Sequence, residues 1–411
     1  MSKPTGPIPP YFAADADGML LIGGSRADAL AEQAGATPLF VYDLGIVRQR
    51  VADLRAAMPP GLGLHYAIKA NSHAGLLAAM APLVDGFDVA SAGELGFARD
   101  AGMAAEHVSF AGPGKRDSEL EAAIGAGATL NLESEGEATH ALAIADRLGR
   151  TPRLAIRVNP DFDLKGSGMR MGGGAKPFGI DAERVPALAK KLIAAGADWR
   201  GFHIFAGSQA LDPDAIIETQ AATIALAHSL AAETGAVSPL VNLGGGFGVP
   251  YFAGDEALDI ARIGEALARN AQRTAMEAEG TRFAIELGRW FVAEAGVYLA
   301  RIVDRKLSHG ETFLVTDGGL HHQLAASGNF GTVVRRNYPI AIADKFNESP
   351  VDDAHVVGCL CTPLDRLGDQ VALPQAEPGN LVAIFLAGAY GRSASPSAFL
   401  GHPPAMELTI G

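Results

Sequence analysis

Short β-like runs alternate with amphipathic segments along most of the chain. Eight runs rich in apolar and β-branched residues lie at 64–69, 86–91, 107–112, 129–134, 153–159, 201–206, 240–244 and 282–287. Several segments between them repeat their apolar residues with the period of a helix. These lie at 94–100, 135–148, 182–195, 215–233 and 259–279. Strands that alternate with helices predict parallel βαβ units, and eight units in about 225 residues predict a (β/α)8 barrel. A doubly wound open sheet is the alternative.

The pattern changes after residue 287. Alternating and β-branched runs, separated by Gly, Pro and Asp, lie at 296–304, 312–316, 333–341, 355–360, 381–386 and 405–410. They predict an antiparallel β domain, and the apolar run at 19–23 is a candidate further strand of its sheet. The expected domains are therefore an N-terminal segment at 1–37 that joins the β domain, a barrel at 38–290 and a C-terminal β domain at 291–411.

Charge and composition exclude several classes of protein. The net charge of −13 disfavours non-specific binding to nucleic acid. The only cysteines, Cys359 and Cys361, lie two positions apart, which rules out a disulfide framework. The longest strongly apolar stretch, at 381–390, is too short to span a bilayer, and no secretory leader is visible. We therefore expect a cytoplasmic protein with no nucleic-acid partner and no membrane span.

Two charged residues end predicted barrel strands, where such barrels place their active sites. Lys69 ends the first run; held in the pocket its amine is a nucleophile for a carbonyl, whereas at the rim it is merely solvated. Glu286 ends the eighth run, and a buried carboxylate there needs a cationic or N–H partner. That partner is either Arg289 or a protonated ring nitrogen of a ligand.

A glycine-rich loop follows the seventh run. Gly244, Gly245 and Gly246 form either a phosphate-binding loop or a plain turn, and Val249 occupies a position where a dinucleotide-binding fingerprint needs glycine. The two cysteines lack a second pair of ligands at zinc-binding spacing. The pair 321–322 consists of adjacent histidines, which point apart and are expected to be a loop feature. The sequence therefore predicts no metal site.

Together these motifs resemble the fold-type III pyridoxal-phosphate (PLP) decarboxylases, whose barrel is also that of alanine racemase. The family includes diaminopimelate, ornithine and arginine decarboxylases, and the resemblance runs from about residue 38 to the C-terminus. The motifs that carry it are HYAIKAN (65–71), GFDVASAGEL (86–95), RVNP (157–160), FAGSQ (205–209), GGGFG (244–248), ELGR (286–289), GCLCTPLD (358–365) and GAY (388–390).

The resemblance implies a role for each matching residue. Lys69 is the Schiff-base lysine, Glu286 contacts the pyridinium nitrogen, and Cys361 of the partner subunit is the catalytic acid. A homodimer with shared active sites follows. The remaining implied PLP-binding residues are Asp88, Arg157, Phe205, Ser208, Gly244, Gly245, Gly246, Gly288, Arg289 and Tyr390. A carboxylate at the ring nitrogen favours decarboxylation over the alternative, a racemase or epimerase; a non-catalytic PLP-binding protein is a further alternative.

Departures from the family pattern bear on the substrate. Phe205 stands where the family has a histidine stacked on the PLP ring. Thr362 stands where decarboxylases of basic amino acids have an acid that holds the distal ammonium, although Asp317 or Asp365 could substitute as substrate-binding residues. We therefore expect a substrate other than a free basic amino acid.

The CTPLD and HIFAGSQ forms resemble a subgroup of exosortase-associated and carrier-protein-glutamate decarboxylases. The expected substrate or partner is thus an amino acid or an amino-acyl carrier protein. Arg335 and Arg336 are candidates for the basic patch that an acidic carrier would need, or else belong to a solvated loop.

Overall fold

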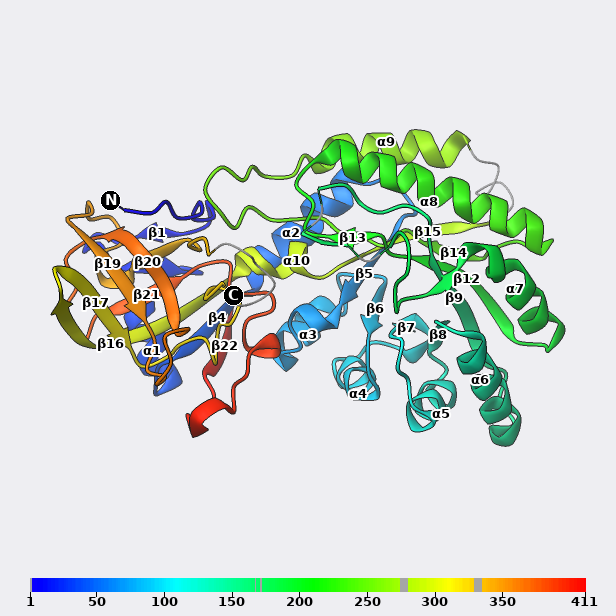
Figure 1. Cartoon of the computed structure of the whole chain (residues 1–411), viewed down its shortest axis with the longest axis horizontal. Coiled ribbons are helices and arrows are strands. Elements are labelled where there is room, and N and C mark those ends of the chain that lie inside the picture. The colour runs from blue at the N-terminus through cyan, green and yellow to red at the C-terminus, as the bar shows by residue number, and fades with distance from the viewer. Residues whose placement is uncertain (1, 167, 171, 274–279, 329–334) are drawn as a thin grey trace. The chain divides into compact units, whose positions relative to one another are not determined.

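The computed structural model describes residues 2–166, 168–170, 172–273, 280–328 and 335–411 (Figure 1). Internal contacts divide the chain into two compact units. One, here called the barrel unit, comprises residues 50–248 and 257–288. The other, here called the β unit, comprises residues 1–49, 249–256 and 289–411.

Eight parallel strands close into a barrel. Each strand pairs with the next, β15 pairs with β5, and β8 pairs with β9, so the sheet has no free edge within this ring. The strands are β5 (Gly63–Ala67), β6 (Gly86–Val89), β7 (Val108–Phe110), β8 (Thr129–Leu132), β9 (Arg153–Asn159), β12 (Asp198–Ile204), β14 (Leu240–Asn242) and β15 (Arg282–Leu287). The (β/α)8 prediction is confirmed, and the open-sheet alternative is excluded by the closure.

Helices follow the strands and lie outside them in Figure 1. They are α3 (Ala74–Met80), α4 (Ala92–Asp100), α5 (Asp117–Ala126), α6 (Glu135–Leu148), α7 (Val185–Ala194), α8 (Pro213–Thr234) and α9 (Ile260–Arg273). Residues 274–279 of the helix predicted at 259–279 lie outside the described residues. An eighth helix, α2 (Leu44–Ala57), joins the two units in sequence.

A reciprocal cap turns the chain from strand β6 into helix α4. The Ser91 hydroxyl accepts a bond from the Glu94 amide at 3.1 Å, and the Glu94 carboxylate accepts one from the Ala90 amide at 2.7 Å. Ser134 and Glu137 repeat the arrangement at the start of α6. In each cap the serine satisfies a first-turn N–H that has no partner inside the helix, and the glutamate accepts the N–H of the residue before the N-cap, so helix and strand end meet at a defined place.

The β unit is built on a mixed sheet of eight strands. Its main path is β18-β21-β16-β17-β19-β20, and β4 and β22 attach beside β16. The strands are β4 (Leu39–Asp43), β16 (Gly296–Ser308), β17 (Glu311–Thr316), β18 (Ile340–Ile342), β19 (Asp352–Val357), β20 (Arg366–Leu373), β21 (Leu381–Ile384) and β22 (Met406–Ile410). The predicted antiparallel pairing holds for most neighbours, but β17–β19 and β4–β22 are parallel.

Two segments differ from their predicted places. Strand β4, expected within the barrel domain, pairs instead with β16 and β22. The apolar run at 19–23 forms β2 (Leu20–Ile22) in a separate three-stranded sheet, because β1 (Ala13–Ala14) and β3 (Ser25–Arg26) occupy both of its edges. It therefore joins the β unit by packing in one apolar core with β4 and β16 rather than by sheet pairing.

Residues 333–334 of the strand predicted at 333–341 lie outside the described residues. Among the described helices, none combines the length and the apolar character that crossing a membrane requires.

Candidate active site

Lys69 lies at the carboxyl end of β5, in a single 3-10 turn (η1, Ile68–Ala70). Ile68 and Ala70 point into the protein, whereas Lys69 is exposed. Its Nζ atom lies 5.6 Å from the centroid of the Phe205 ring, which follows β12. A cation near an aromatic face is held electrostatically, so the amine stays beside the ring at this end of the barrel.

Glu286, near the end of β15, is 6% exposed and is held by side chains of β14 and β12. Its Oε2 atom accepts a bond from Asn242 Nδ2 at 3.1 Å and lies 2.8 Å from His203 Nε2. No bond to Oε1 is formed by the described residues, so this oxygen is the one available to a ligand. The sequence did not identify His203 and Asn242 as partners of Glu286. Each is a polar residue inside an otherwise apolar strand, and this pattern could have indicated them.

The charge of Glu286 is maintained by its surroundings. Burial alone would raise the pKa of its carboxyl group, but His203, Lys69 and Arg157 outweigh burial and lower the pKa to about 2. Glu286 is therefore an anion throughout the physiological range, as a partner for a protonated ring nitrogen must be.

Arg157 on β9 is fixed by a buried ion pair. Its Nη1 lies 2.9 Å from Glu133 Oε1, and its guanidinium stands 5.1 Å from the Phe178 ring. Glu133 also accepts bonds from the amides of Gly112 and Gly179. Buried charges need this degree of pairing, and the pair keeps a positive charge close enough to act on Glu286.

Asp88 on β6 is buried beside His65 on β5. Asp88 Oδ2 lies 3.4 Å from His65 Nδ1, and neither oxygen of Asp88 makes a hydrogen bond with the described residues. Burial would lower the pKa of His65, but the adjacent Asp88 and the charge of Glu286 raise it. Two buried carboxylates therefore lie in the polar interior of the barrel, each next to a histidine.

The glycine loop after β14 passes too close to other backbone for side chains. A Cβ atom on Gly245 would lie 2.1 Å from the carbonyl oxygen of Glu286, and one on Gly246 would lie 2.5 Å from that of Gly207. Gly244 and Gly246 also have positive φ, at 68° and 82°, which glycine adopts without strain. Because Gly246 packs on Gly207, this loop lies beside Ser208, as a shared phosphate site requires.

Arg289 and Tyr390 lie together in the β unit. The Arg289 guanidinium stands 4.7 Å from the Tyr390 ring, and its Nη1 donates to the hydroxyl of Tyr251 at 3.0 Å. Its Nε atom is buried and has no partner among the described residues. Tyr251 was missed from the sequence. Gly288, the residue before Arg289, ends the barrel unit, and a Cβ there would lie 2.8 Å from that of Ala70.

The cysteine loop follows β19 in the β unit. Cys359 and Cys361 lie in bends that follow β19, so the strand predicted at 355–360 ends before both of them. Cys361 is exposed and Cys359 is half-buried, with its Sγ 3.5 Å from the carbonyl oxygen of Asp317. Thr362 shapes the loop, because its carbonyl accepts a bond from Asp365 and its hydroxyl one from Leu364.

Asp317 and Asp365 are engaged by their own unit. Asp365 accepts bonds from the amides of Leu320 and Leu360, at 2.6 and 2.8 Å. Asp317 accepts bonds from Thr37 and from the amide of Arg301. Burial raises the pKa of both carboxyl groups. Each of the four carboxylate oxygens already has a donor, so these acids hold loops together.

The residues of the two units, taken separately, fit PLP. The barrel unit offers an amine beside an aromatic ring, a buried carboxylate with one free oxygen and a glycine loop that a Cβ would fill. The β unit offers a buried guanidinium nitrogen without a partner. An amine suits the aldehyde of PLP, a carboxylate suits its pyridinium nitrogen, and a glycine loop and a guanidinium suit its phosphate.

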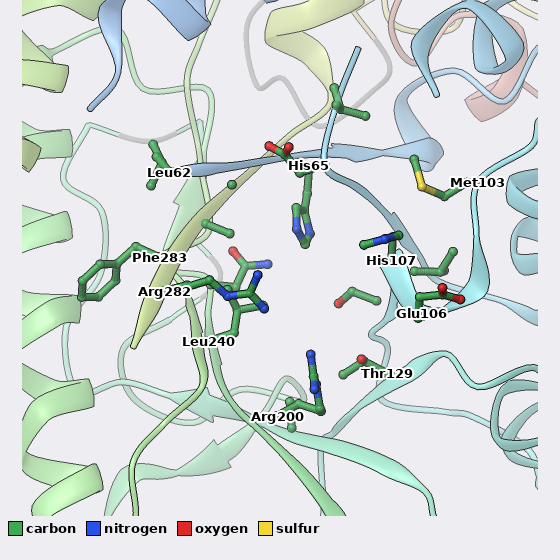
Figure 2. Close-up of a pocket in the computed structure, with 18 of the residues that line it drawn as sticks. Leu62, His65, Met103, Glu106, His107, Thr129, Arg200, Leu240, Arg282 and Phe283 are labelled. Carbon is green, nitrogen blue, oxygen red and sulfur yellow. The ribbon is translucent and has the colours of Figure 1, made fainter. Parts of the chain in front are cut away.

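A cavity of about 650 Å³ opens at the other end of the barrel. Figure 2 shows Arg200, Arg282 and His107 around it, from the amino-terminal ends of the strands, and His65 inside it. Asn242 also lines it. It therefore extends to the side chains that support Asp88 and Glu286, but Lys69 and the glycine loop do not line it.

Comparisons with known proteins identify the family. Residues 44–293 match the family described as "Pyridoxal-dependent decarboxylase, pyridoxal binding domain". The chain is 38% identical to the L-glutamyl-[BtrI acyl-carrier protein] decarboxylase of Niallia circulans, over 90% of this chain and 88% of that protein. It is 30% identical to the diaminopimelate decarboxylase of Aquifex aeolicus, over 96% of this chain and 91% of that protein.

A solved structure agrees. The diaminopimelate decarboxylase of Helicobacter pylori complexed with L-lysine superposes with a TM-score of 0.82 and 28% identity, covering 93% of this chain and 94% of that one. The chain is therefore a PLP-dependent carboxy-lyase and belongs to the pyridoxal-dependent decarboxylase family.

Proposed function

We propose that this decarboxylase removes the α-carboxyl group of a glutamyl-type amino-acyl group carried by an acyl-carrier protein, rather than that of a free basic amino acid. The observation that carries the proposal is that no acid stands at position 362 and that the nearby aspartates already have hydrogen-bond donors. Thr362 carries no charge, and the oxygens of Asp317 and Asp365 are taken by their own unit. Of these three described residues, none offers a distal ammonium a carboxylate oxygen without a donor, and a buried unpaired ammonium is costly.

The comparisons support the same substrate class. Identity to the carrier-protein glutamate decarboxylase is 38%, whereas identity to the diaminopimelate decarboxylases of Aquifex aeolicus and Methanothermobacter thermautotrophicus is 30% and 28%. A tethered substrate presents no free distal ammonium, which suits a site without an anchor for it.

Three residues carry the chemistry in this proposal. PLP, when bound, withdraws electrons from the α-carbon, so that its bond to the carboxyl group can break. Lys69 would hold the cofactor covalently through its exposed amine. Glu286, whose Oε2 is oriented by His203 and Asn242, would keep the ring nitrogen of bound PLP protonated. Cys361 delivers a proton to the α-carbon after carbon dioxide leaves.

Cys361 acts in the site of the partner subunit of a homodimer. Exposed apolar side chains flank its loop: Leu364 is 56% exposed, and Phe399 and Leu400 are 45% and 53% exposed. The two segments meet, because Cys359 Sγ lies 3.8 Å from His402 Nδ1. Exposed apolar side chains gathered around one loop are typical of an interface with another chain.

Arg336 is the residue best suited to meet an acidic carrier protein. It is exposed and stacks 3.8 Å from the Phe252 ring, whereas Arg335 is tied to the carbonyl of Arg366. A charge placed on a rim acts mainly on the association rate and on its salt dependence. Arg336→Glu should therefore raise KM for a carrier-bound substrate but not for the same amino acid on a short pantetheine thioester.

Carbon dioxide release by the PLP-loaded protein tests the substrate. The panel holds free lysine, ornithine, arginine, diaminopimelate and glutamate beside a glutamyl carrier-protein thioester. Release from the thioester alone is the expected result. Efficient release from a free basic amino acid would overturn the argument from Thr362, and release from free glutamate at the same rate would show that the carrier is not recognised.

A further inference from the structure

Three potential metal ligands meet in the β unit, from segments far apart in sequence. His321 lies in the turns after β17, Cys359 lies after β19, and His402 precedes β22. One ligand atom of each lies within 4.8 Å of the other two. Cys359 Sγ is 3.8 Å from His402 Nδ1, and the imidazole centroids of His321 and His402 are 5.3 Å apart.

The state of His321 points to a missing partner. Its side chain is fully buried, and neither ring nitrogen makes a hydrogen bond with the described residues. In the adjacent His322, by contrast, both ring nitrogens have partners. Its Nδ1 lies 3.1 Å from the Tyr298 hydroxyl, and its Nε2 lies 3.0 Å from the carbonyl oxygen of Pro403. Buried polar groups are nearly always satisfied, so an imidazole with both nitrogens unpaired indicates a ligand that binds there.

The surroundings hold two of the three residues in place. Asp365 accepts a bond from the amide of Leu320, which precedes His321, and another from the amide of Leu360, which follows Cys359. Gly319 and Gly358 allow this, because a Cβ on either would lie within 2.3 Å of an Asp365 oxygen. One carboxylate thus fixes both ligand-bearing segments, the arrangement that outer groups provide in metal sites.

The donor set indicates the class of ion. A thiolate with two imidazoles suits zinc and similar divalent transition ions, and not magnesium or calcium, which prefer oxygen. In a tetrahedral zinc site the sulfur and a nitrogen lie about 3.6 Å apart. The Cys359–His402 distance of 3.8 Å is close to this value. A His321 nitrogen lies within 4.8 Å of both other ligand atoms and would have to move closer when an ion binds.

We propose that His321, Cys359 and His402 bind one zinc-class divalent ion per chain, with a fourth position open to water or to a ligand. This site is separate from the residues assigned to PLP, and the proposal does not depend on the substrate. The chain passes from Cys359 to Cys361 through one residue, so a bound ion would tether the loop that carries Cys361. The sequence predicted no metal because it shows only adjacent histidines and a two-residue cysteine spacing. The expectation that the two histidines point apart was wrong, since their ring centroids lie 3.7 Å apart.

Metal analysis of the tag-free, PLP-loaded protein tests the proposal. After exposure to Zn²⁺ and dialysis, we expect one zinc per chain. Replacement by Co²⁺ should give a thiolate-to-cobalt charge-transfer band together with the visible bands of a tetrahedral ion. Cys359→Ser and His321→Gln should each weaken zinc binding at least tenfold. Cys359→Ser should also remove the charge-transfer band of the cobalt protein, and His321→Gln should alter its visible bands.

Cys361→Ser is the matched control, since it removes the neighbouring thiol but should keep zinc and the cobalt spectrum. Circular dichroism and the PLP absorption of every variant establish that it is folded, which keeps a loss of metal interpretable. Absence of bound zinc in the parent protein would overturn the proposal. A cobalt-loaded protein without a thiolate charge-transfer band would also overturn it. The same holds if Cys361→Ser loses the metal while Cys359→Ser retains it.

Discussion

His203 Nε2, on β12, lies 2.8 Å from Oε2 of Glu286 on β15, with β14 between the two strands in the sheet. Asn242 bonds the same oxygen, so the carboxylate is oriented from one side and leaves Oε1 for a ligand. This pair explains how a carboxylate that is 6% exposed remains ionised. It also makes a pH-dependent contribution to stability that can be measured.

The contribution of Glu286 to stability should disappear at acidic pH. The pKa of Glu286 falls from its ordinary value of 4.5 to about 2 on folding. Its stabilisation is therefore fully present above about pH 4.5 and is lost as the pH falls toward 2. Between about pH 5 and about pH 3, urea unfolding of the cofactor-free protein should show a smaller loss in the free energy of unfolding for Glu286→Gln than for the parent protein. Equal pH slopes for the two proteins would contradict the assignment.

Lys69→Ala should lose the visible absorption band of lysine-bound PLP and reduce carbon dioxide release to background, because no other described lysine is placed beside Phe205. Lys165→Ala serves as control, since Lys165 is an exposed residue paired with Glu218. A spectrum unchanged in Lys69→Ala would remove Lys69 from its role.

Cys361→Ala should retain PLP and slow turnover by about 10²-fold, the usual contribution of a positioned acid. Co-expression with Lys69→Ala chains tests sharing of the sites. If Cys361 acts in the partner's site, half of the dimers are mixed and each has one intact site, so about a quarter of the parental activity returns. If both residues act within one chain, mixed dimers contain no intact site and activity stays low.

Thr362→Glu should add the missing charge. We expect kcat/KM for free lysine or diaminopimelate to rise about tenfold or more relative to the carrier-bound substrate, because the distal ammonium gains a partner. Thr362→Ser keeps the residue uncharged and should leave the preference unaltered. An unchanged preference in Thr362→Glu would place the determinant of substrate choice elsewhere.

Gly245→Ala should damage the loop after β14. The new Cβ would lie 2.1 Å from the Glu286 carbonyl, so the loop must shift. We expect a loss of about 1–3 kcal/mol in the free energy of unfolding and weaker PLP binding. Gly96→Ala in helix α4 is the control, because nothing lies within 4 Å of its Cβ position. It should be neutral or stabilise by about 1 kcal/mol. Similar behaviour of the two variants would argue against a packed loop.

Local patterns along the chain were sufficient for the barrel and for the order of its strands, although six of the eight strands end two residues before their predicted runs do. Apolar periodicity reports the period of each element directly, so the eight barrel strands, Lys69 and the position of Glu286 were all predictable. The motifs also indicated the correct family, because each is a short continuous segment and can be recognised without knowing which distant residues it contacts.

Contacts between distant segments were decided only by the tertiary structure. The support of Glu286 by His203 and Asn242 depends on strand register and barrel closure, and the pairing of β4 with β22 joins the two ends of the chain. His321 and His322 are identical neighbours in sequence, yet one is satisfied by Tyr298 and Pro403 and the other faces Cys359 and His402. A sequence records which groups a residue can offer, whereas folding determines which partners surround it.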